Sequence, residues 1–73
     1  MANDIRGQLT VLAGKKLKDT RVSLGMTQNE LASLLGTGGR MIRSYENGTV
    51  SMTLDRLEEI SRILHVSPIS LLI

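Results

Sequence analysis

The sequence has no cysteine, tryptophan or phenylalanine, and Tyr45 is the only aromatic residue among its 73 residues. Without cysteine, the chain can form no disulfide, thiolate nucleophile, zinc ribbon or iron–sulfur cluster. No apolar run approaches the roughly 18 residues of a membrane-spanning helix, and the first residues lack the basic start and apolar run of a signal peptide. These absences favour a chain of the reducing cytoplasm, with an aliphatic core of Leu, Ile, Val and Met.

Residues for catalysis and metal binding are also scarce. His65 is the only histidine, without a second His or a carboxylate cluster at ligand spacing, so we expect no metal site. Glu58 and Glu59 are adjacent and would diverge on a helix, which makes them a poor acid–base pair. The glycine-rich segment 36–40 lacks the preceding strand of a phosphate-binding loop. We therefore expect no enzyme activity, no cofactor and no small-molecule ligand.

Length and charge indicate one domain, residues 1–73, with an uneven surface. The net charge is +2, but residues 15–43 carry six Lys or Arg against two carboxylates, whereas residues 44–73 carry two Arg against four carboxylates. This separation indicates one surface for a polyanion and another for a different partner. A mixed, solvated surface is the alternative.

Apolar residues recur at helical spacing and sustained alternation is missing, which predicts an all-α fold. A capping box at Thr27 and Glu30 starts one helix and Gly36 ends it. The expected helices are a first one ending near residue 24, then 27–36, 39–46, 53–65 and a short one after Pro68. Gly14 favours a break in the first helix, with residues 1–11 as an N-terminal extension. Residues 27–47 thus have the layout of a helix-turn-helix.

The chain resembles the phage-repressor/Cro-type (XRE-like) helix-turn-helix family over roughly residues 12–72. The matching residues are Leu17, Arg21, Gly25, Met26, Thr27, Gln28, Glu30, Leu31, Ala32, Gly36, Ile42, Tyr45, Glu46, Asn47, Gly48, Thr53, Leu54, Leu57, Ile60, Leu64, Val66, Leu71 and Leu72. The resemblance implies a compact five-helix domain that binds double-stranded DNA in the major groove, usually as a dimeric repressor. It also implies a bacterial or phage-encoded protein.

The resemblance implies that the helix over 39–46 faces the DNA bases. Arg40, Arg43 and Ser44 occupy positions that face the groove in the family. Arginine can bind guanine O6 and N7 with two donors, so Arg40 is the leading candidate for base recognition. Arg43 could equally hold a phosphate, and Ser44 would discriminate poorly among bases. A solvated helix face is the alternative for all three.

Phosphate contacts are implied on both sides of this helix. The family holds a phosphate with the side chain at Gln28 and with the free amides of the helix that Thr27 caps. It uses the loop after the recognition helix, here Asn47 and Thr49, in the same way, and Lys15 would add attraction or a flanking contact. A solvated helix start, a plain turn and a solvated lysine are the alternatives.

Gly38 and Gly39 depart from the family pattern, which places Ser or Thr at the cap and a polar side chain next. Glycine permits a close backbone approach to DNA, so we assign Gly38 to phosphate and Gly39 to base contact. The missing side chains also predict weaker direct recognition of bases. Arg21 and Glu46 match a structural ion pair of the family.

The leading prediction is a sequence-specific DNA-binding transcriptional regulator that represses by occluding its operator as a homodimer. The alternative is a protein-interaction module, antitoxin-like or regulatory, with the acidic face of the helix over 53–65 as its surface. The apolar segment 69–73 is buried in the core, buried in a partner, or exposed by truncation of a longer protein.

Overall fold

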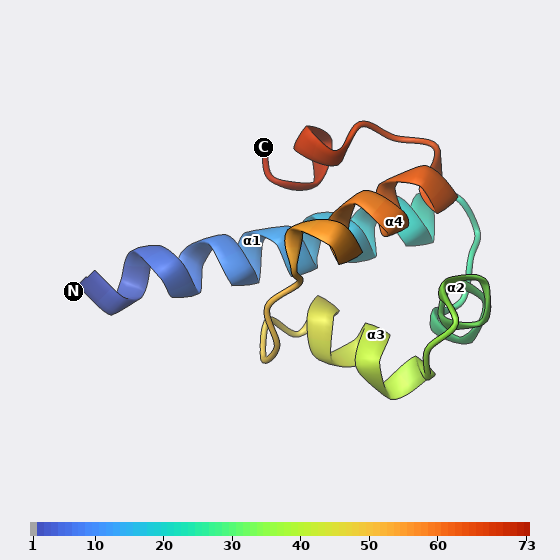
Figure 1. Ribbon diagram of the computed structural model, residues 1–73, viewed down its shortest axis with the longest axis horizontal. Helices are drawn as coiled ribbons and strands as arrows, with labels where there is room; N and C mark the ends of the chain where they lie inside the picture. The colour runs from blue at the N-terminus through green and yellow to red at the C-terminus, as the bar shows by residue number, and fades with distance from the viewer. Residues whose placement is uncertain (1) are drawn as a thin grey trace.

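The computed structural model describes the backbone of residues 2–73 and the side chains of residues 7–73. This part of the chain forms four α-helices and one 3-10 turn and has no strand (Figure 1). The elements are α1 Ala2–Ser23, α2 Gln28–Leu35, α3 Gly39–Glu46, α4 Leu54–Leu64 and the 3-10 turn η1 Pro68–Leu71. The all-α prediction is confirmed, whereas the prediction of a fifth α-helix is wrong.

The segment expected to be the fifth helix is only a single 3-10 turn. Ser67 caps it by accepting the Ile69 N–H at 3.3 Å, and Ser70 N–H donates to the Ser67 carbonyl at 3.0 Å. Leu71 is fully buried, while Ile69 and Ser70 are exposed. One turn therefore suffices to bring the anchoring leucine into the core.

Helix α1 is continuous, so the expected break near Gly14 does not occur. Gly14 is buried where α1 crosses the end of α3. A Cβ on this residue would collide with the Tyr45 carbonyl oxygen and would lie 3.0 Å from the Glu46 carbonyl oxygen. Glycine thus permits close helix packing here. The expected extension, residues 1–11, forms the first half of α1, except residue 1, which lies outside the described residues. The N-terminal end of α1 projects from the fold (Figure 1), whereas the Thr10 hydroxyl lies 2.9 Å from that of Ser51.

A single aliphatic cluster joins the elements. Its fully buried side chains come from every element and are Leu17, Leu31, Ile42, Ile60, Leu64 and Leu71. Burying one such side chain stabilises a protein by about 1.5–3 kcal/mol relative to leaving it exposed. Since α3 packs on both α1 and α2, and α2 also contacts α4, this core holds the α2–α3 unit in a defined orientation.

Candidate nucleic-acid interface

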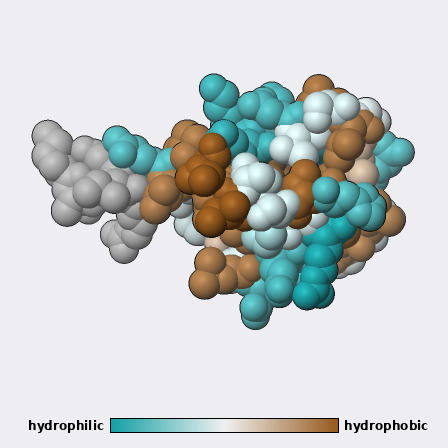
Figure 2. Space-filling model, turned by 90° about the horizontal axis from the view of Figure 1, so that it is seen from above, coloured by the Kyte–Doolittle hydropathy of each residue, from teal (hydrophilic) through white to brown (hydrophobic). Residues whose placement is uncertain are grey.

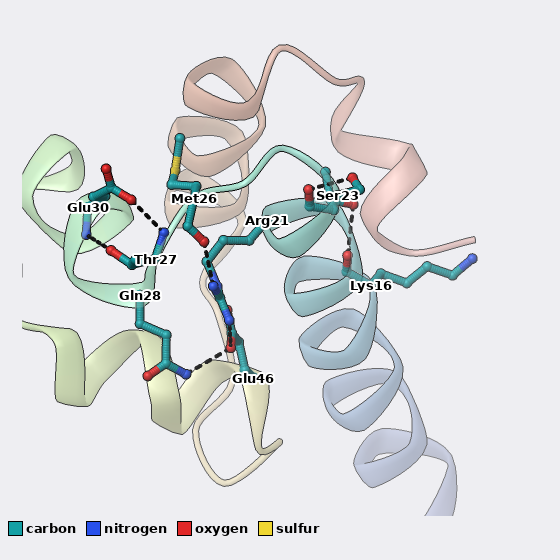
Figure 3. Close-up of polar contacts among 9 residues, drawn as sticks. Lys16, Arg21, Ser23, Met26, Thr27, Gln28, Glu30 and Glu46 are labelled. Atoms are coloured by element: carbon teal, nitrogen blue, oxygen red, sulfur yellow. Dashed lines mark hydrogen bonds and ion pairs between the residues drawn. The ribbon is translucent and has the colours of Figure 1, made fainter.

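Helices α2 and α3 and the turn between them form the expected helix-turn-helix. At the start of α2, the Thr27 hydroxyl accepts the Glu30 N–H at 3.0 Å and Glu30 Oε1 accepts the Thr27 N–H at 2.7 Å (Figure 3). The bond from the Thr27 backbone, and then the one with its side chain, lower the pKa of Glu30. Gly36 ends α2 with φ 79°, a left-handed conformation that glycine adopts without strain.

Helix α3 has one buried and one exposed face. Ile42 and Tyr45 are buried in the core, and they set the rotation of the helix about its axis. Arg40 and Arg43 are exposed, three residues apart, and therefore neighbours on the same side of the helix. Neither guanidinium forms an ion pair with another residue whose side chain is described. Ser44 is half-buried, one turn beyond Arg40, so it is less accessible to a ligand.

A buried polar network fastens α1 to both helices of the motif (Figure 3). Arg21 Nε and Nη2 donate to Glu46 Oε2 and Oε1 at 2.6 and 3.0 Å, and its Nη1 donates to the Met26 carbonyl at 2.6 Å. The side chains of Arg21 and Glu46 are only 9% and 1% exposed. The hydrogen bonds to Glu46 raise the pKa of Arg21, although burial opposes this shift. The structure thus contains the ion pair implied by the family resemblance.

Gln28 belongs to the same network, which the sequence did not indicate. It lies in the first turn of α2, and its Nε2 donates to Glu46 Oε1 at 2.9 Å (Figure 3). One amide N–H is therefore engaged inside the protein and the other stays available to a ligand. The phosphate roles of Gln28 and Thr27 remain predictions, for which Glu46 would hold the glutamine amide in place.

The loop after α3 folds back onto the end of that helix. Thr49 N–H and its hydroxyl both donate to the Ser44 carbonyl, at 3.1 and 3.2 Å. The Thr49 hydroxyl is thus already a donor within the loop, which leaves the exposed Asn47 amide as the better phosphate donor. Lys15 is exposed and directly follows Gly14, where α1 meets α3. Both lie at this end of α3, and their DNA contacts remain predictions.

The opposite end of α3 starts with two glycines. Gly38 is the N-cap, with an extended backbone at φ −94° and ψ 156°. Because it has no side chain, no hydroxyl or carboxylate at this position caps the first amides of α3. Gly39, the first helical residue, lies beneath the side chain of Asn29, because a Cβ on Gly39 would be 3.3 Å from Asn29 Cγ. Asn29 was not predicted as a site residue. In the sequence, the glycine at position 39 is the feature that indicates space for a neighbouring side chain.

No group of three or more metal-ligating side chains occurs among the residues described. No helix in the same part of the chain has the length and hydropathy needed to cross a membrane.

Comparison with known proteins gives the family context. A family model described as helix-turn-helix matches residues 17–71. An HTH-type transcriptional regulatory protein of Pyrococcus abyssi is 40% identical over 62 residues, which cover 81% of this chain and 20% of the relative. Control protein C.BamHI of Bacillus amyloliquefaciens is 37% identical over 73 residues, which cover 99% of this chain and 85% of the relative. The chain spans only 20% and 44% of the length of the first two curated relatives.

Solved structures share the fold. The restriction-modification controller protein C.AhdI from Aeromonas hydrophila matches with a TM-score of 0.83 and 25% identity, over 89% of this chain and 94% of that chain. Apo-HppE matches with a TM-score of 0.83 and 32% identity, over 89% of this chain but 36% of that chain. HppE has also been solved with iron(II) and substrate. The same fold therefore occurs both in a small controller protein and within a longer chain.

Proposed function

This chain belongs to the helix-turn-helix family, and we propose that it binds a specific sequence of double-stranded DNA and regulates transcription as a repressor. The observation that carries this proposal is the exposed face of α3, where Arg40 and Arg43 lie side by side above a buried, fixed face. An α-helix with its side chains is about 10–12 Å in diameter, and it therefore fits a major groove that is about 12 Å wide.

The two arginines have the chemistry for base recognition. Each guanidinium can donate two parallel hydrogen bonds to guanine O6 and N7, and such a pair contributes about 1–3 kcal/mol of discrimination against a wrong base. Arg40 lies nearer the start of α3 and is our first candidate for guanine, whereas we assign Arg43 either to a base or to a phosphate. Ser44, which is half-buried, would contribute less.

Phosphate contacts on both sides would set the register of α3 in the groove. At its start, we assign Thr27, Gln28 and Gly38 to one backbone segment. At its end, we assign Asn47, Thr49 and Lys15 to a second backbone segment. Asn47 would be the principal donor, because the Thr49 hydroxyl already donates to the Ser44 carbonyl. We also place Gly39 at a base edge, where α3 carries no side chain of its own and the Asn29 side chain lies over the glycine.

An apolar surface supports a homodimer. Figure 2 looks onto the face formed by α4 and the C-terminal segment and shows apolar side chains gathered there. Leu54, Ile69 and Ile73 are 80, 61 and 81% exposed. Within the apolar segment 69–73, Leu71 is buried in the core, whereas Ile69 and Ile73 remain at the surface. Leu54, Ile69 and Leu72 line a shallow hollow on this face. A second copy would cover these side chains and place two α3 helices on half-sites about 34–36 Å apart.

The test of the dimer is sedimentation equilibrium of the protein and of Ile69→Glu. We expect a dimer that the glutamate dissociates, because a carboxylate would be buried without a partner. Leu34→Glu, a change at an equally exposed leucine on α2, is the matched control and should leave the dimer intact. A monomer at every concentration would contradict the proposal of a homodimer.

The test of DNA recognition is selection of bound sequences from a random duplex pool at two salt concentrations. We expect an enriched palindrome, affinity that falls steeply with salt through counterion release, and loss of preference at one guanine in Arg40→Ala. Arg62→Ala, which removes an exposed charge from α4, is the control. Binding without enrichment would contradict sequence-specific recognition.

Absence of binding at both salt concentrations would favour the alternative function, a protein-interaction module. The observation that favours this alternative is the hollow beside α4, which combines apolar walls with the carboxylates of Asp55 and Glu58. A partner with a basic and apolar surface would fit it. Binding to such a partner would depend less on salt than DNA binding does.

A further inference from the structure

The side chain of Asn29 fills the space that a larger residue at position 39 would need. A Cβ on Gly39 would collide with Asn29 Oδ1 and would lie 3.3 Å from Asn29 Cγ. Asn29 comes from the first turn of α2, whereas Gly39 is the first residue of α3. The amide group of Asn29 therefore stands at the start of α3, where the helix itself carries no side chain.

Asn29 differs from its neighbours Gln28 and Glu30, whose side chains form hydrogen bonds within the protein. Gln28 donates to Glu46 at 2.9 Å, and Glu30 accepts the Thr27 N–H at 2.7 Å. Asn29 is exposed, and its amide makes no hydrogen bond with any residue whose side chain is described. Both its N–H donors and its oxygen are thus available to a ligand that approaches α3.

We propose that Asn29 is a specificity-determining residue that binds a base at the N-terminal end of α3, in place of the side chain missing at Gly39. This inference rests on the proposed DNA binding through α3. An asparagine amide can accept from N6 and donate to N7 of adenine at once. The structure therefore assigns an adenine preference to the base pair next to the pair that faces Arg40.

Gly39 is needed for this placement of the Asn29 amide. Because a Cβ on Gly39 would collide with the flexible end of the Asn29 side chain, alanine there would displace the amide without removing it. Asn29→Ala removes the amide and leaves the glycine. The two substitutions act on different helices, yet they should cause the same loss of base recognition.

The experiment is sequence selection with the parent protein, Asn29→Ala, Gly39→Ala and the double variant. Ser33→Ala, which trims another exposed side chain of α2, is the control. We expect both single variants to lose about 5- to 150-fold of preference at the same base pair, the equivalent of one bidentate contact. The double variant should lose no more than Asn29→Ala, and Ser33→Ala should retain the parent's preference. Circular dichroism checks that each variant is folded.

Two outcomes would overturn the inference alone. One is a parent protein that selects a defined sequence while Asn29→Ala selects the same sequence with the same preference at every position. The other is uniform weakening of Asn29→Ala across all sequences, which would indicate a phosphate contact. A parent protein that selects no sequence would overturn the proposed function as well, so the two failures are distinguishable.

Discussion

Replacement of Arg21 with alanine should destabilise the domain far more than it alters the preferred DNA sequence. In the described structure, Glu46 accepts two hydrogen bonds from Arg21 and one from Gln28. Without Arg21, a carboxylate that is 1% exposed would retain only the glutamine. The Met26 carbonyl would also lose its donor, at 2.6 Å in the intact protein.

The magnitude follows from this loss of partners. Removing one member of a buried ion pair costs about 3–5 kcal/mol, and the remaining bond from Gln28 favours the lower end, about 3 kcal/mol. A domain of this size loses about 4–8 °C in Tm for each kcal/mol. We therefore expect Arg21→Ala to lower the Tm by about 12–24 °C. The underlying loss of about 3 kcal/mol is a large share of the total free energy of unfolding of such domains, which is about 5–15 kcal/mol.

The assay is thermal and urea unfolding followed by circular dichroism. The paired replacement Arg21→Met with Glu46→Leu should be more stable than Arg21→Ala, because it leaves no buried charge without a partner. Arg62→Ala is the control, since its ion pair with Glu58 at 3.2 Å is exposed and contributes at most about 0.5 kcal/mol. A fall in Tm of less than about 4 °C for Arg21→Ala would refute the reasoning.

Two further predictions concern helix packing and pH. Gly14→Ala should lower the Tm, because the new Cβ would collide with the Tyr45 carbonyl oxygen. Gly7→Ala, with open space around the residue, should instead raise the free energy of unfolding by about 1 kcal/mol. Equal effects of the two substitutions in thermal unfolding would contradict the packing argument. The pKa of Glu30 is lowered by its bonds to Thr27, so this stabilisation is present above the ordinary glutamate pKa and is lost as pH falls through the folded value. NMR titration should show a Glu30 pKa below its ordinary value in the parent and only a partial rise in Thr27→Ala, because the backbone N–H of residue 27, the larger cause, remains. An ordinary Glu30 pKa in the parent protein would argue against the capping box.

Residues that act on their immediate neighbours were predictable from the sequence. The capping box at Thr27, the left-handed Gly36 and the bounds of α2 and α3 agree with the structure, because a cap or a turn depends on residues within one helical turn of it. The exposed position of Arg40 and Arg43 was predictable for the same reason, since Ile42 and Tyr45 define the buried face of so short a helix.

The sequence by itself therefore determined helices α2, α3 and α4, the helix-turn-helix layout and the cationic face of α3. Only the tertiary structure decided that α1 continues through Gly14, that Gln28 binds Glu46 and that Asn29 covers Gly39. Each of these features joins residues that are 10 or more positions apart in the chain. Their distance is set by how helices pack in the core, and periodicity within a single helix carries no information about that packing.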